Sequence, residues 1–160
     1  MHFPIITIEN FDTPVEDWET DLDYEDSTLN YHTDYYGEMY SEEDRKTYIE
    51  SGSLEQILDG IATVDRENEA ITFLDAETIR STIGNYFEEV LYELRKKAEE
   101  GNLCGYELRK EGYYWRDWYT MFYDMTEGYG HGETSMDFVE DAKWKAGRTV
   151  RIGNIFDAHI

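Results

Sequence analysis

The residues of this chain that could carry chemistry are its many carboxylates and its four histidines. His2, His32, His131 and His159 are scattered, and no two have the spacing of one helical turn that is typical of a zinc site. Cys104 is the single cysteine, so the chain has no internal disulfide and no zinc site built from several thiolates. The sequence does not exclude a metal site whose histidine and carboxylate ligands are distant in the chain and are brought together by the fold.

Two short motifs resemble ligand-binding loops but match neither pattern. Gly128-x-Gly130-x-Gly132 lacks the lysine of a phosphate-binding loop, and we predict a flexible loop over residues 126–134. Asp21-x-Asp23-x-Glu25 resembles the start of a calcium loop, but the glycine and glutamate required further along are missing. No nucleophile elbow or catalytic-triad spacing is present. We therefore expect no enzymatic activity, no metal and no cofactor.

The carboxylates are unevenly distributed along the chain. The 160 residues contain 37 Asp and Glu against 14 Lys and Arg, which gives a formal net charge of -23. Of these acids, 14 lie between Met1 and Asp44, where there is no Lys or Arg. A charge this large disfavours binding to nucleic acid or to an anionic membrane and favours basic partners. We predict one domain over residues 1–160 with a strongly acidic N-terminal segment, 9–44.

The predicted contact surface combines acids with interleaved tyrosines. Carboxylates on one side of a strand recur every ~6.6 Å, and on a helix they lie ~5–6 Å apart, so either geometry makes a ribbon of negative charge. Tyrosine is favoured at protein interfaces. The predicted partner-binding residues are Glu16, Asp17, Glu19, Asp21, Asp23, Tyr24, Glu25, Asp26, Asp34, Tyr35, Tyr36, Glu38, Glu42, Glu43 and Asp44.

Several elements must position these residues. Residues 3–9, 70–74 and 148–156 are predicted as strands, and 41–51 as a helix that begins at a capping box. The strongest pattern predicts a long helix over 76–100, whose core side would be formed by Ile83, Phe87, Val90 and Leu94.

Three segments are harder to interpret. Residues 14–25 fit either a helix, which the Thr13-Pro14 start favours, or a strand with one acidic face. Residues 103–110 and 113–123 are predicted to form a hairpin that turns at Glu111-Gly112. Residues 136–146 fit a helix or a strand. Together these elements predict an α+β fold: an antiparallel or mixed sheet packed against one long amphipathic helix, with shorter helices.

In size, charge and lack of catalytic motifs, the chain resembles the acidic DNA-mimic inhibitors of phages and mobile elements, of the anti-restriction and anti-CRISPR type. The resemblance is compositional and transfers no functional residues. It implies that the chain blocks the nucleic-acid-binding site of a basic defence or nuclease protein. Immunity proteins that neutralise nuclease toxins share these properties, and an acidic scaffolding protein without inhibitory role is the other alternative.

The start of the chain has no basic region ahead of its short apolar run, so we expect no signal peptide and no membrane span. The expected location is the cytoplasm, which would be that of the host cell for a phage-encoded protein. The expected partner is a protein, with no direct contact to nucleic acid or membrane. The sequence leaves a homodimer open.

Overall fold

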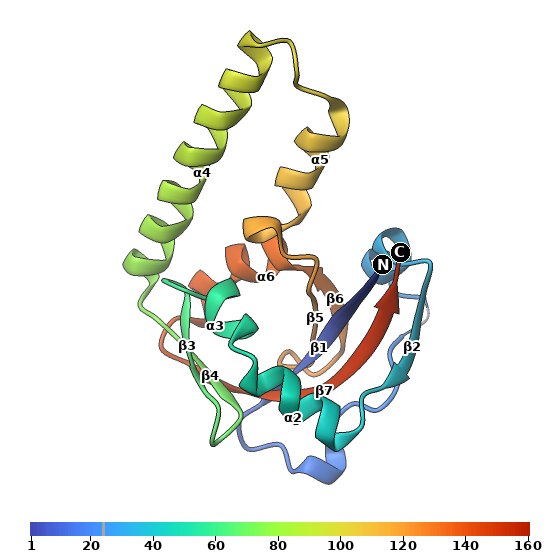
Figure 1. Ribbon diagram of the computed structural model, residues 1–160. Coiled ribbons are helices and arrows are strands. Elements are labelled where there is room, and N and C mark those ends of the chain that lie inside the picture. Colours follow the sequence, from blue (N-terminus) through green and yellow to red (C-terminus); the bar gives the residue numbers. More distant parts are fainter. Residues whose placement is uncertain (24) are drawn as a thin grey trace.

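The computed structural model describes residues 1–23 and 25–160, so Tyr24, one of the predicted partner-binding residues, lies outside the described residues (Figure 1). The strands are β1 (His2–Asn10), β2 (Tyr35–Met39), β3 (Ala62–Asp65), β4 (Ala70–Phe73), β5 (Met121–Asp124), β6 (His131–Thr134) and β7 (Thr149–His159). The α-helices are α1 (Ser27–His32), α2 (Glu42–Glu50), α3 (Ser53–Ile57), α4 (Ala76–Glu99), α5 (Gly105–Tyr113) and α6 (Ser135–Asp141). Single 3₁₀ turns are η1 (Val15–Asp17), η2 (Trp115–Asp117) and η3 (Ala142–Lys145).

The seven strands form one mixed sheet in the order β3-β4-β7-β1-β5-β6, and β2 pairs with the C-terminal half of β7. β1 and β5 are parallel, and all other pairs are antiparallel. The predicted α+β class, with a mixed sheet and one long helix, is confirmed. The predicted strands 3–9, 70–74 and 148–156 correspond to β1, β4 and β7.

Side chains of β1 enter a hydrophobic core on each face of the sheet, so both faces are covered by other parts of the chain. Successive strand residues point to opposite faces, so Ile6 and Ile8 enter a large core with α3 and α6, while Phe3 and Ile5 enter a smaller one. The smaller core is closed by three side chains from the N-terminal third of the chain: Leu22, Leu29 and Tyr36. The acidic segment is therefore also the cover of one sheet face.

Residues 14–25 form neither the favoured helix nor the alternative strand within the part of the chain that the structure describes. One 3₁₀ turn, η1, follows Pro14, and Trp18 then has extended backbone angles. A helix would place Val15, Trp18 and Leu22 on one buried side, but Val15 is 66% exposed. The irregular chain places Trp18 beneath the Arg45 guanidinium and buries Leu22 in the smaller core. These tertiary contacts outweigh the helix propensity that the Thr13-Pro14 start indicated.

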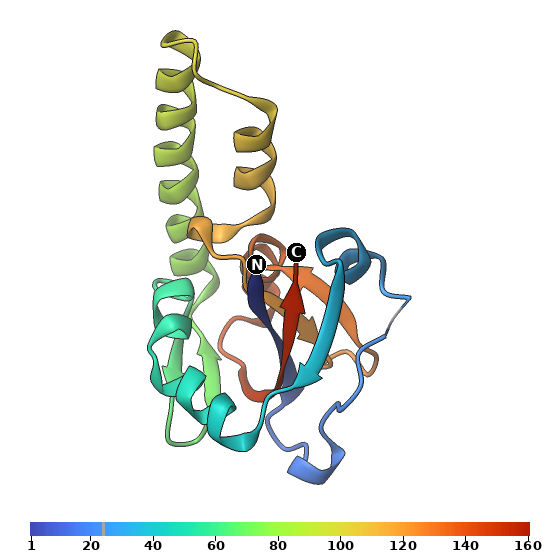
Figure 2. The same cartoon turned by 45° about the vertical axis from the view of Figure 1, so that its right-hand side comes forward.

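The long helix is confirmed as α4, but its contact with the core is confined to its N-terminal part. Asp75 caps it by accepting a hydrogen bond from the Thr78 amide. Ile79 is fully buried, and Ile83 and Phe87 pack half-buried on the large core. Val90 and Leu94, predicted as core residues, are half-buried outside that core. Figures 1 and 2 show why: beyond its first turns, α4 projects away from the sheet beside α5.

The hairpin predicted for 103–123 is wrong. Residues 105–113 form α5, which is joined to α4 by the ion pair of Lys97 with Glu107 at 2.5 Å. Glu111-Gly112 lies inside that helix and makes no turn. Between α5 and β5, Trp115 is fully buried, and its indole NH donates to the Ile57 carbonyl. Only residues 121–123 of the predicted second strand are in a strand, β5.

Residues 136–146 adopt the helical alternative, as α6 followed by η3. The cap is Thr134, whose hydroxyl forms a reciprocal capping box with Asp137. The predicted helix 41–51 is confirmed as α2, with Ser41 as its cap. Part of the expected loop 126–134 is the strand β6, which the sequence pattern did not reveal.

Candidate functional site

Most of the predicted partner-binding acids lie on the surface. Of the twelve carboxylates in that set, ten are exposed and two, Glu19 and Asp26, are half-buried. The exposed acids are Glu16, Asp17, Asp21, Asp23, Glu25, Asp34, Glu38, Glu42, Glu43 and Asp44. They come from the irregular segment after β1, from both ends of β2 and from the first turn of α2.

Some predicted contact residues have structural roles instead. Tyr36 is buried in the smaller core, and its hydroxyl donates to the Asp23 carbonyl, so it is not part of the surface. Asp26 caps α1 by accepting from the Leu29 amide, and its second oxygen accepts from the Gly132 amide at 2.8 Å. Tyr35 is 54% exposed and stacks on His159. The surface thus keeps one of the described tyrosines of the predicted set.

Ion pairing separates the N-terminal acids from the rest of the chain. Eight carboxylates pair with Lys or Arg among the described residues, and every partner in these pairs lies at or beyond Arg45. None of the described acids between Met1 and Asp44 has such a pair, and the ion-pair contact of that segment is made by His2, whose ring lies 2.8 Å from Asp157. The negative charge of the N-terminal surface is therefore not neutralised by cationic side chains of the chain itself.

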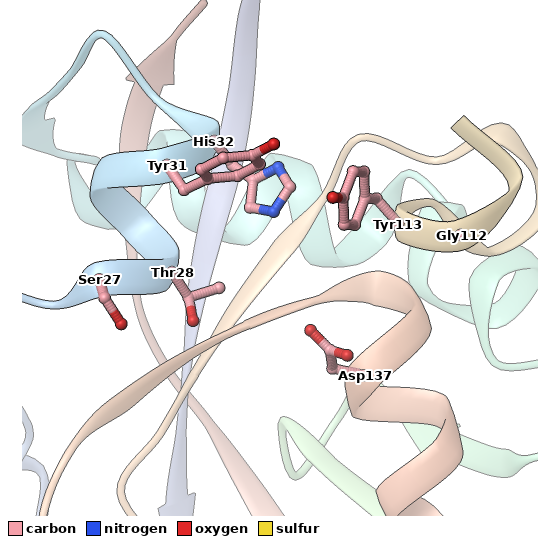
Figure 3. Close-up of a pocket in the computed structure, with 7 residues that line it drawn as sticks. All are labelled: Ser27, Thr28, Tyr31, His32, Gly112, Tyr113 and Asp137. Atoms are coloured by element: carbon pink, nitrogen blue, oxygen red, sulfur yellow. The ribbon is translucent and has the colours of Figure 1, made fainter. Parts of the chain in front are cut away.

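An open recess lies beside this surface, between α1, the end of α5 and the start of α6. Its volume is about 430 Å³, and its lining residues are Ser27, Thr28, Tyr31, His32, Gly112, Tyr113 and Asp137. Figure 3 shows the ring of Tyr113 facing His32, with Asp137 on the opposite wall. Burial lowers the pKa of His32, and the Asp137 carboxylate partly offsets this. Because Asp137 is engaged in the α6 capping box, the recess offers aromatic rings together with the hydroxyl groups of Ser27 and Thr28.

The most heavily buried ionisable cluster lies on the other side of the sheet, on the β5–β6 hairpin. Asp124 ends β5 directly opposite His131, which begins β6. Glu133 follows two residues later, so its side chain shares a face with that of His131. Atom Nε2 of His131 lies 3.2 Å from Oε1 of Glu133. Lys145 of η3 completes the cluster by an ion pair with Asp124, and both side chains are buried.

Burial dominates the electrostatics of this cluster. It raises the pKa of Glu133 to about 7, with a contribution from the nearby Asp124 charge, against the opposing effects of Lys145 and His131. Burial alone would also raise the pKa of Asp124, but the Lys145 ammonium and hydrogen bonds from Thr126 lower it below its usual range. The two carboxylates thus have opposite pKa shifts within one hollow of about 160 Å³.

The glycines beside this cluster serve packing. A Cβ at Gly130 would lie 2.2 Å from the Tyr123 ring, and one at Gly132 would lie 2.8 Å from both Asp26 and Leu29. Small residues are therefore required where the hairpin meets α1 and the smaller core. We predicted a flexible loop here and therefore did not consider that His131 and Glu133, two residues apart, would share one face of a strand. That spacing is the sequence signal that could have indicated the cluster.

No protein-family model matches this sequence, and the curated proteins and solved structures contain no significant match to it. No helix within 1–23 and 25–160 combines the length and apolar character that crossing a bilayer requires.

Proposed function

We propose that this protein is an acidic DNA mimic that binds the nucleic-acid-binding site of a basic defence or nuclease protein. One observation carries the proposal: most of the N-terminal acids are exposed, and none forms an ion pair with Lys or Arg of the described chain, whereas eight later carboxylates do. Exposed acids without such a pair also occur later in the chain, for example Glu88 and Glu89, but only the N-terminal acids lack Lys and Arg partners altogether among the described residues.

The arrangement of the acids supports a mimic of a charged backbone. From Asp17 to Glu25, alternate residues are acidic while Trp18 and Leu22 are buried. The buried pair attaches this irregular segment to the sheet, so its carboxylates are held on a folded support. Because a preformed charged surface loses less conformational entropy on binding than a disordered tail, it can compete with duplex DNA, which carries one charge per roughly 1.7 Å of axis.

The test compares two variants that carry the same change of charge. In the first, Asp17, Asp21, Asp23 and Glu25 are replaced by Asn or Gln; in the second, the exposed Glu88, Glu89, Glu93 and Glu100 are replaced by Gln. Both bring the formal net charge from -23 to -19. Each protein is immobilised, loaded with the heparin-binding fraction of a bacterial lysate, and eluted with duplex DNA.

We expect the unmodified chain and the α4 variant to retain a protein that duplex DNA displaces, and the N-terminal variant to lose it. With the retained protein purified, its affinity should fall steeply as salt rises, because contacts between exposed charges are screened within about 3 Å at 1 M. Equal retention by both variants, or retention that duplex DNA does not affect, would contradict the proposal. The second result would favour an immunity or scaffolding role.

A further inference from the structure

The cluster on the β5–β6 hairpin has the composition of a metal site that the proposed function does not use. Asp124, His131 and Glu133 each offer one ligand atom, and these atoms lie within 4.8 Å of one another. Ligands bound at ~2.0–2.2 Å to one ion lie at most about 4 Å apart, so a small side-chain adjustment would bring all three into contact with an ion. All three project from adjacent strands, which fixes their spacing.

An independent observation points to a missing ligand. Oε2 of Glu133 and Nδ1 of His131 are buried without a hydrogen-bond partner among the described residues, and the Glu133 residue is only 4% exposed. A buried carboxylate oxygen without a partner loses its hydration without gaining a hydrogen bond in exchange, which is unfavourable. A cation in the hollow would accept an electron pair from Oε2 of Glu133 and would neutralise the carboxylate, and the His131 ring offers one of its nitrogens to the same ion.

The surroundings are suited to a cation despite the presence of Lys145. The hollow is also lined by Glu127 and Asp141, so four carboxylates line it together with the Lys145 ammonium, and Arg148 lies 4.0 Å from Glu127. The Lys145 ammonium and the Thr126 amide and hydroxyl donate to Asp124 and hold its carboxylate in place, as partners beyond the ligands do in metal sites. Each carboxylate oxygen has two lone pairs, so Asp124 can accept these hydrogen bonds and still bind an ion.

We propose that Asp124, His131 and Glu133 bind a divalent transition-metal ion. Mixed carboxylate and imidazole ligands favour Zn²⁺ or Mn²⁺ over Mg²⁺ or Ca²⁺, which bind mainly oxygen. The site lies on the sheet face opposite Asp26 and Leu29, because Gly132, between His131 and Glu133, faces those two residues. It is therefore separate from the acidic surface, and neither proposal depends on the other.

The test is a titration of the metal-free full chain with Mn²⁺ and with Zn²⁺, followed by calorimetry and, for Mn²⁺, by electron paramagnetic resonance. We expect one saturable site whose affinity falls at least about tenfold in both Glu133→Gln and His131→Gln, since even partners beyond the ligands affect affinity by about 10–100-fold. Glu133→Gln removes a buried charge without changing side-chain size, so circular dichroism should show an intact fold.

Two control variants separate this site from other cation-binding groups. Asp21→Asn with Asp23→Asn removes charge from the acidic surface, and His2→Gln removes the histidine whose ring contacts that of His159 near the chain ends. Both controls should keep the affinity of the unmodified chain. The proposal is overturned if no saturable site exists, if Glu133→Gln and His131→Gln bind as tightly as the unmodified chain, or if either control weakens binding as much as they do.

Discussion

At the scale of single residues, the buried acids stand apart from the many exposed ones. Glu9 is buried on β1, where its Oε1 accepts the amide hydrogen of Glu19 at 2.9 Å. Gly153 on the neighbouring strand makes room for it, because a Cβ there would lie 2.8 Å from Cγ of Glu9. Burial raises the pKa of Glu9 above its ordinary value of 4.5, and the charges of Glu19 and Asp124 act in the same direction.

The raised pKa of Glu9 predicts a pH-dependent contribution to stability. A carboxyl group with a higher pKa in the folded chain stabilises the fold below its unfolded pKa, and this contribution is lost as pH rises through the folded pKa. Glu9→Gln keeps the hydrogen-bond acceptor without the charge. We expect it to raise the thermal midpoint more at about pH 8 than at about pH 5.

The exposed Glu16 provides the matched control, because Glu16→Gln removes the same charge from a solvated position. Its effect on the midpoint should be similar at both pH values. A lower midpoint for Glu9→Gln at the higher pH would show that the buried carboxylate is stabilising in its charged form.

At the scale of elements, α4 changes environment along its length. Its first turns belong to the large core through Ile79, whereas its second half lies in the helical arm formed with α5, where Leu91 is 63% exposed. One helix with a continuous apolar side is therefore anchored at one end. Tyr86 marks the transition: its ring packs on Trp115 at 4.3 Å between centroids.

Because burial decreases along α4, we expect two side-chain truncations on the same side of this helix to lower the free energy of unfolding by different amounts. Ile79→Ala should destabilise the protein by about 2–5 kcal/mol, as expected for a fully buried aliphatic side chain. Leu94→Ala should cost about 1 kcal/mol or less, because half-buried Leu94 lies outside the core. Chemical denaturation of both variants measures the difference. Equal costs would mean that the arm is packed as tightly as its base.

At the scale of the whole molecule, charge opposes compaction. Exposed ion pairs contribute about 0–1 kcal/mol each, so the six pairs other than the buried Lys145–Asp124 and Arg45–Glu69 pairs do little against a net charge of -23. Salt screens repulsion over long distances more than it weakens close partly buried pairs. Repulsion should therefore dominate the response of stability to salt.

We expect the thermal midpoint to rise as NaCl increases from about 0.05 M to about 1 M, since the Debye length falls to about 3 Å. The variant neutralised at Asp17, Asp21, Asp23 and Glu25 should have a higher midpoint at low salt and a smaller rise. Circular dichroism melts of both proteins measure this. A midpoint that falls with salt would show that the ion pairs outweigh the repulsion.

The sequence by itself determined the elements whose signals are local. The β-branched run of β1, the Ser41 cap of α2 and the periodicity of α4 each specify an element through neighbours in the chain, and the structure contains all three. The sequence also shows directly that the N-terminal segment contains acids but no Lys or Arg before Arg45.

Only the tertiary structure decided which side chains meet. Residues 103–123 were predicted as a hairpin, but they form α5 and η2 and only their last residues enter a strand, β5, while Trp115 is fully buried in the core. The three proposed metal ligands come together through hairpin pairing across a loop that showed no strand signal. Contacts between residues distant in sequence depend on how the elements pack, and local propensity contains no information about that packing.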